Sequence, residues 1–128
     1  MKITAMDIET DSLDATRIWV VVAKDINTGV VDVFKHLDTD EAEATRFKAY
    51  CKAYDKFLFH NGIGFDALMI LKIYGLDLYH LKFFDTWIAS QVLNYRRPHK
   101  HGLAGWGQHL SYPKFNYDDW SGFSDEMM

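Results

Sequence analysis

The 128 residues can form one buried core but not two, so we expect a single domain spanning residues 1–128. A net charge of −4 argues against a broad basic surface for nucleic acid, and the single cysteine, Cys51, excludes an internal disulfide. An acid already at position 7 argues against a signal peptide, and no apolar run approaches bilayer-spanning length. We therefore expect a cytoplasmic protein with no membrane partner.

The first third of the sequence predicts a three-stranded antiparallel meander. Its strands are expected at Lys2–Ile8, Arg17–Ala23 and Val30–Phe34. The second is a continuous run of mostly β-branched residues, which is typical of a strand buried on both faces. The turn at Asp25–Gly29 joins the second and third strands as a hairpin.

Helices and short strands alternate in the rest of the chain. Asp38–Asp40 predicts the cap of a helix through about Tyr54, and Gly75 closes a later helix. The expected elements that follow are a strand at Lys56–His60, a glycine loop at Asn61–Phe65, a helix at Asp66–Tyr74, a strand at Phe83–Phe84, helices at Thr86–Leu93 and Gly102–Leu110 around a basic loop at Tyr95–Lys100, an irregular stretch at Tyr112–Gly122, and a helix start at Ser124. This order predicts an α/β fold with a mixed sheet flanked by helices, and ligands at the carboxyl ends of its strands.

Three carboxylates are candidates for a metal site. Asp7 and Glu9 are two residues apart on a strand, so their side chains leave the same face, but an isolated Asp-x-Glu is more often a solvated pair. Asp66 follows a second strand that should lie beside the first, although an acid there could also be a helix cap. Together the three could hold a pair of Mg²⁺ or Mn²⁺ ions about 4 Å apart, the arrangement that serves in-line phosphodiester hydrolysis.

At these residues the sequence resembles the 3′→5′ exonuclease domains of family A DNA polymerases, which are DnaQ-like (DEDD) enzymes with an RNase H-like fold. Asp7–Leu13 resembles their first motif and His60–Asp66 their second, while Phe84–Thr86 and His101–Leu110 resemble the connecting segment. The Gly-Trp-Gly at 105–107 and the acidic, aromatic end are most similar to the replicative polymerases of T-odd bacteriophages. The resemblance covers essentially the whole chain.

The resemblance implies a magnesium- or manganese-dependent exonuclease that removes the 3′-terminal nucleotide of single-stranded DNA. It makes Asp7, Glu9 and Asp66 the catalytic ligands of two divalent cations, and it makes Thr10, Leu13, Asn61 and Phe65 the residues that bind the strand end. From the residues alone, Leu13 could instead pack in a turn, Asn61 could serve only the turn, and Phe65 could belong to the core.

The third motif of such domains, Tyr-x-x-x-Asp, does not occur in the sequence. His80 and Asp85 have the spacing of its histidine variant, but Asp85 fits better as a buried structural acid or helix cap. We therefore expect a domain that lacks its last motif and helix, which would leave an apolar groove beside Asp7 and Glu9.

Three alternatives stay open for what such a chain does. It could be an exonuclease whose missing motif lies on a separate polymerase chain, a module that binds DNA 3′ ends without cleaving them, or a protein that docks on a polymerase. His99 and His101 flank a basic run that could contact phosphate or simply be solvated, and as zinc ligands they lack a third partner.

Overall fold

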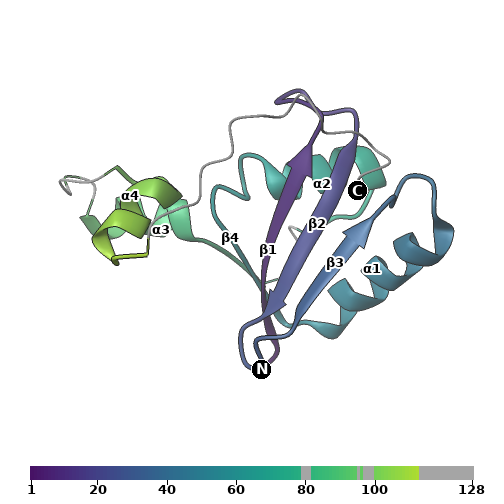
Figure 1. The fold of residues 1–128 in the computed structure, drawn as a ribbon, viewed down its shortest axis with the longest axis horizontal. Helices are drawn as coiled ribbons and strands as arrows, with labels where there is room; N and C mark the ends of the chain where they lie inside the picture. Colours follow the sequence, from purple (N-terminus) through teal and green to yellow (C-terminus); the bar gives the residue numbers. More distant parts are fainter. Residues whose placement is uncertain (79–81, 95, 97–99, 113–128) are drawn as a thin grey trace.

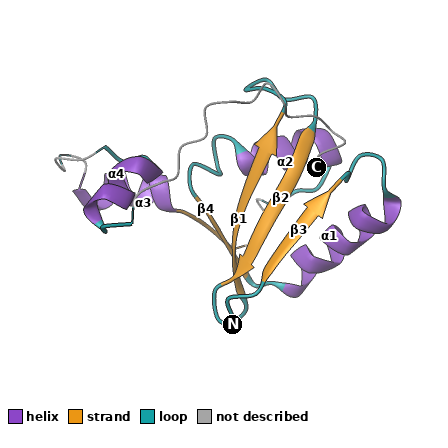
Figure 2. Cartoon of the chain, in the orientation of Figure 1, coloured by secondary structure: helices purple, strands orange, loops and turns teal. Residues whose placement is uncertain are grey.

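The computed structural model describes residues 1–78, 82–94, 96 and 100–112. Figures 1 and 2 show the strands of a twisted sheet together with the helices beside it. The described elements are β1 (Ile3–Thr10), β2 (Ile18–Asp25), β3 (Val31–Lys35), α1 (Glu41–Ala53), β4 (Lys56–Phe59), α2 (Asp66–Tyr74), β5 (Lys82–Asp85), α3 (Thr86–Asn94) and α4 (Leu103–His109). The predicted elements beyond residue 112 lie outside the described residues, as does His80.

The sheet has the strand order β3-β2-β1-β4-β5. β1 pairs antiparallel with β2, and β2 pairs antiparallel with β3, which confirms the predicted meander. On the other side of β1, β4 and β5 run parallel to it because helices connect them across the sheet. This mixed sheet flanked by helices is an RNase H-like fold, as predicted.

One face of the sheet carries the hydrophobic core. On β1 this face holds Thr4, Met6 and Ile8, which are buried and alternate with the residues of the opposite face. α1 lies against it through Tyr50, whose hydroxyl is 2.7 Å from Thr4 Oγ1, and α2 adds Met69 and Ile70 among others. The remaining buried apolar side chains of this core include Val21, Ala23, Phe34, Phe47, Cys51, Phe57 and Phe59.

The opposite face of the sheet is open beside Asp7. Val22 pairs with Asp7 and Val33 pairs with Val22, so the three side chains share this face, and the two valines are 39 % and 41 % exposed. The prediction that the second strand is buried on both faces is therefore wrong. A run of valines does not show which face of the sheet is covered, and here α1 and α2 pack on the face opposite Val22. The two valines lie on the face where the apolar groove beside Asp7 and Glu9 is expected, and that groove stays a prediction.

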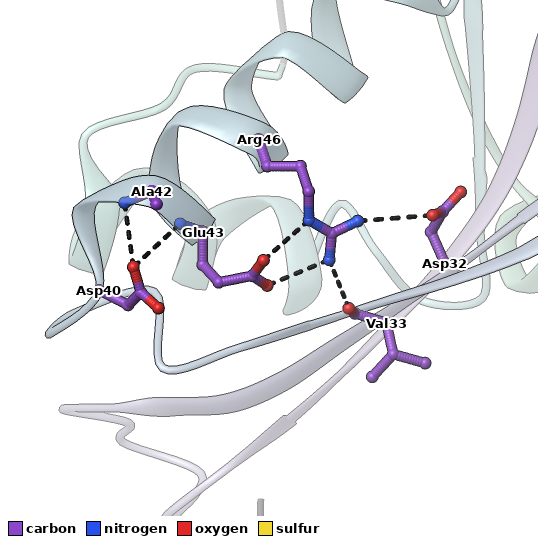
Figure 3. Close-up of polar contacts among 6 residues, drawn as sticks. All are labelled: Asp32, Val33, Asp40, Ala42, Glu43 and Arg46. Atoms are coloured by element: carbon purple, nitrogen blue, oxygen red, sulfur yellow. Dashed lines mark hydrogen bonds and ion pairs between the residues drawn. The ribbon is translucent and has the colours of Figure 1, made fainter.

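α1 is fixed at its start by a cap and along its length by one arginine (Figure 3). The Asp40 carboxylate accepts hydrogen bonds from the backbone N–H groups of Ala42 and Glu43, as the sequence predicts. Arg46 forms a two-pronged contact with Glu43, donates to the Val33 carbonyl at 2.7 Å and lies over the Phe34 ring. The arginine thereby joins the exposed side of α1 to the edge strand β3.

α3 and α4 form a pair that extends away from the sheet, at the left of Figure 1. The indole N–H of Trp106 on α4 donates to Ser90 Oγ on α3 at 2.7 Å, and the same oxygen is 2.6 Å from His101 Nδ1. Ser90 is buried at this junction. None of the described helices is both long and apolar enough to cross a membrane.

Candidate active site

The candidate site forms where β1 and β4 approach their carboxyl ends and α2 begins. Between β4 and α2 the chain turns sharply: Asn61 adopts a left-handed conformation with φ of 60°. Gly62 passes so close to Phe59 that a Cβ atom there would lie 2.2 Å from Phe59 Cβ, so glycine is required. This turn places Asp66 as the first residue of α2, directed toward β1.

Asp7 and Asp66 are brought together as predicted. Asp66 is only 4 % exposed, and its carboxyl contacts the backbone N–H of Ile8 and shares a hydrogen bond with the Asp7 side chain. Burial, followed by the negative charge of Asp7, raises the pKa of Asp66 from 3.8 to about 7. No described residue offers a hydrogen bond to its buried Oδ2 atom. When Asp66 is protonated it carries no charge, which reduces the repulsion between the two carboxyl groups.

Glu9 lies on the same face of β1 as Asp7, two residues further on, and pairs with Val20. The regular pairing of β1 with β2 breaks immediately after it, between Glu9 and Thr10. Among the described residues, no three His, Cys, Asp or Glu side chains already form a group able to hold a metal ion. A single proton reduces the repulsion between two carboxylates. A third carboxylate that is ionised is still repelled by them unless a cation is present.

The donor set nevertheless fits a divalent cation. Mg²⁺ and Mn²⁺ take carboxylate oxygens, and a buried carboxyl oxygen with no hydrogen bond from a described residue is a group that a cation would satisfy. Asp7 and Asp66 would be its ligands, and Glu9 is placed on the correct face to join them.

Asp85 is equally buried but is fully engaged by the backbone. Its Oδ1 accepts from the N–H groups of Asn61, Trp87 and Ile88, and its Oδ2 accepts from that of Ile63. It therefore caps α3 and also fixes, through hydrogen bonds, the loop that precedes Asp66. The interpretation of Asp85 as a structural acid and helix cap is confirmed, and its oxygens have little capacity left for a metal.

The loop that joins β1 to β2 presents Leu13 to solvent. The Asp11 carboxylate organises this loop by accepting from the Thr16 N–H, the Thr16 hydroxyl and the Arg17 N–H. Thr10 donates through its hydroxyl to the Ser12 carbonyl. Leu13 is 89 % exposed, so packing within the turn does not account for it. The organising role of Asp11 was not predicted, although its place directly after the β1 strand was a signal for a turn-forming acid.

Asn61 and Phe65 flank the turn before α2 in different environments. Asn61 is exposed, and its left-handed backbone shows that it also serves the turn. Phe65 is half-buried and packs against the core, which favours the structural interpretation of this ring.

His60 and Thr86 form a polar pair that the sequence did not single out. His60 Nδ1 is 2.9 Å from Thr86 Oγ1, and the Thr86 hydroxyl donates to the Phe59 carbonyl at 3.1 Å. Their positions directly after β4 and β5, at the carboxyl ends of parallel strands, were the signal for their proximity. In the basic loop, Arg96 and Lys100 are exposed, whereas Arg97 and His99 lie outside the described residues.

No protein-family model and no curated protein matches this sequence. Among solved structures, the chain is similar to the family B DNA polymerase of the hyperthermophilic archaeon Pyrobaculum calidifontis, with a TM-score of 0.62 and 16 % sequence identity. The match covers 85 % of this chain but only 18 % of the polymerase chain. At this identity the likeness shows the fold alone. The match to a family B polymerase does not support the predicted resemblance to family A exonuclease domains specifically; it supports only a fold that is also present in a DNA polymerase.

Proposed function

We propose that this chain is a metal-dependent 3′→5′ exonuclease domain that acts on the 3′ end of single-stranded DNA. The observation that carries the proposal is the contact between the buried Asp66 and the exposed Asp7 near the carboxyl ends of parallel strands in an RNase H-like sheet. The structural neighbour is a DNA polymerase, and the sequence has two exonuclease-like motifs; both support nucleic acid as the substrate.

Asp7 and Asp66 would hold the divalent cations, with Glu9 completing the acidic face. When bound, the cations supply an activated water and stabilise the leaving 3′ oxygen. Asp66 would release its proton as a cation binds, because a ligand carboxylate must be ionised. Thr10 and Asn61 would contact the strand end, and the exposed Leu13 would stack on its last base, a contact that tolerates any base.

Hydrolysis of a 3′-labelled single-stranded oligonucleotide in Mg²⁺ tests this function. Asp7→Asn and Asp66→Asn should each lower the rate by at least about a hundredfold, because each removes a cation ligand. Asp55→Asn is the matched control. This exposed acid accepts from the Lys2 N–H and precedes the first residue of β4, so it lies at the end of β4 away from Asp66. Equal rates for Asp66→Asn and the wild type would refute the proposal.

A second candidate function is binding of a DNA 3′ end without hydrolysis. It is favoured by one observation, namely that only two of the three acids converge among the described residues. It predicts a wild-type chain that binds the oligonucleotide in a manner that depends on divalent cations and on Asp66, yet leaves the oligonucleotide intact.

A further inference from the structure

A pocket of about 330 Å³ lies between β4, β5, α3 and α4, separate from the acid pair. It opens on the sheet face that carries Asp7, because Phe84 pairs with Leu58, Leu58 pairs with Ala5, and Ala5 is two residues before Asp7. Its volume is within the range of pockets that take small organic molecules. Its lining includes apolar and aromatic side chains together with two polar ones: Phe84, Leu93, Leu103, Trp106, His60 and Thr86.

The two aromatic walls of this pocket have different surroundings. Trp106 is held by its indole N–H bond to Ser90 Oγ, and Ser90 is itself buried and bonded to His101. The indole ring therefore has a fixed orientation before any ligand arrives, which reduces the entropy lost on binding. Phe84 is 46 % exposed on the edge strand β5, so its ring is accessible to a ligand.

The polar wall of the pocket is formed by His60 and Thr86. His60 Nδ1 is 2.9 Å from Thr86 Oγ1, and Thr86 Oγ1 is 3.1 Å from the Phe59 carbonyl oxygen. Because His60 Nε2 is buried, the aromatic walls, and not an imidazole hydrogen bond, would recognise a flat ring in this pocket.

The pocket and the acid pair lie on the same face of the sheet. The parallel pairing of β1 with β4 joins Ala5 to Leu58, and Asp7 and His60 each lie two residues further along their segments. A DNA strand that ends at Asp7 and Asp66 would therefore have the pocket on the same sheet face, within reach of one of its last bases.

We propose that this pocket is a nucleobase subsite that takes one of the last three bases of the DNA strand by stacking on Phe84 and Trp106. The inference rests on the proposed function, since it needs a strand end at the acid pair. The subsite holds the strand in place while the acids act on the terminal phosphodiester.

A binding cycle that combines a protein variant with a missing base tests the subsite. Fluorescence anisotropy of labelled oligonucleotides is measured in Ca²⁺, with an abasic position moved through the last three nucleotides. Phe84→Ala should weaken binding of the intact oligonucleotide by roughly tenfold, as expected for one lost stack. One abasic position should weaken wild-type binding by a similar factor, and Phe84→Ala should not weaken binding of that oligonucleotide further.

Two further variants test whether the aromatic face of Phe84, and not apolar volume or any exposed ring, accounts for the affinity. Phe84→Leu retains apolar volume but lacks the aromatic face, so it should lose most of the affinity that Phe84→Ala loses. Tyr112→Ala removes another aromatic ring, 83 % exposed and not among the described lining residues, and should leave affinity unchanged. Because Phe84 is half exposed, the variants should fold, which a thermal melt verifies.

Additive effects of Phe84→Ala and every abasic position would overturn the subsite, as would full affinity in Phe84→Leu. The latter result would identify an apolar crevice that suits a protein side chain. These failures are distinct from failure of the proposed function. If Asp66→Asn abolishes hydrolysis while the cycle is additive, only the subsite is wrong, whereas a wild-type chain that binds no oligonucleotide overturns both.

Discussion

Asp66 and Asp85 are both buried and both lie near the turn that precedes α2, but their hydrogen-bonding partners differ. Asp85 accepts four backbone N–H groups and serves the structure. Asp66 meets another acid, and its Oδ2 receives no hydrogen bond from any described residue. A buried polar atom left in this way destabilises the fold. Its presence beside Asp7 is understandable if the pair is built for a cation.

The pKa of Asp66 leads to a prediction about stability in the absence of metal. This pKa is about 7 in the folded protein and 3.8 ordinarily, so the folded state holds the proton more tightly than the unfolded chain. The stability that Asp66 contributes is present below pH of about 4 and is lost as pH rises to about 7. Asp66→Asn should therefore gain about 2–3 kcal/mol over the wild type between pH 5 and pH 8.

Urea denaturation with a chelator present, at both pH values, measures this difference in the free energy of unfolding. Asp55→Asn serves as control, because it makes the same chemical change at an exposed carboxylate that accepts from the Lys2 N–H. A pH-independent difference for Asp66→Asn would contradict the assigned pKa of Asp66.

Among the elements, the turn before α2 and the start of α3 are joined through a single side chain. Asp85→Ala should lower the free energy of unfolding by about 2–4 kcal/mol, because it removes a helix cap and also leaves the N–H groups of Asn61 and Ile63 without their acceptor. Asp40→Ala removes only the cap of α1 and should lower it by about 1 kcal/mol. Urea denaturation compares the two variants, and equal losses would show that Asp85 is only a cap.

The elements were predictable from local patterns, and the site only in part. Alternation and turn residues predicted the meander, and parallel strand ends predicted that Asp66 would reach Asp7. Val22 was mispredicted because a run of valines does not reveal which layers cover a strand. The raised pKa of Asp66 depends on burial by distant segments, which no local pattern contains.

At the scale of the whole molecule, the sheet face beside Asp7 is exposed at Val22 and Val33, and residues 1–128 contain no Tyr-x-x-x-Asp motif. We propose that a polypeptide segment carrying Tyr-x-x-x-Asp supplies the acid that residues 1–128 do not contain and covers Val22 and Val33. Adding such a polypeptide should raise hydrolysis of single-stranded DNA by roughly a hundredfold or more, the usual contribution of a general base or acid.

The same polypeptide with its motif Asp changed to Ala should give no increase, and neither polypeptide should rescue Asp66→Asn. A wild-type chain already at full rate, with no response to the added polypeptide, would show that the motif is dispensable.

The buried Cys51 in α1 has a practical consequence. It is the single thiol in the sequence, and burial raises its pKa to about 12. A folded molecule should therefore resist alkylating reagents, since these attack the thiolate. The rate of alkylation then reports how often the core beneath α1 opens, so the native chain carries its own reporter of conformational opening and needs no added dye.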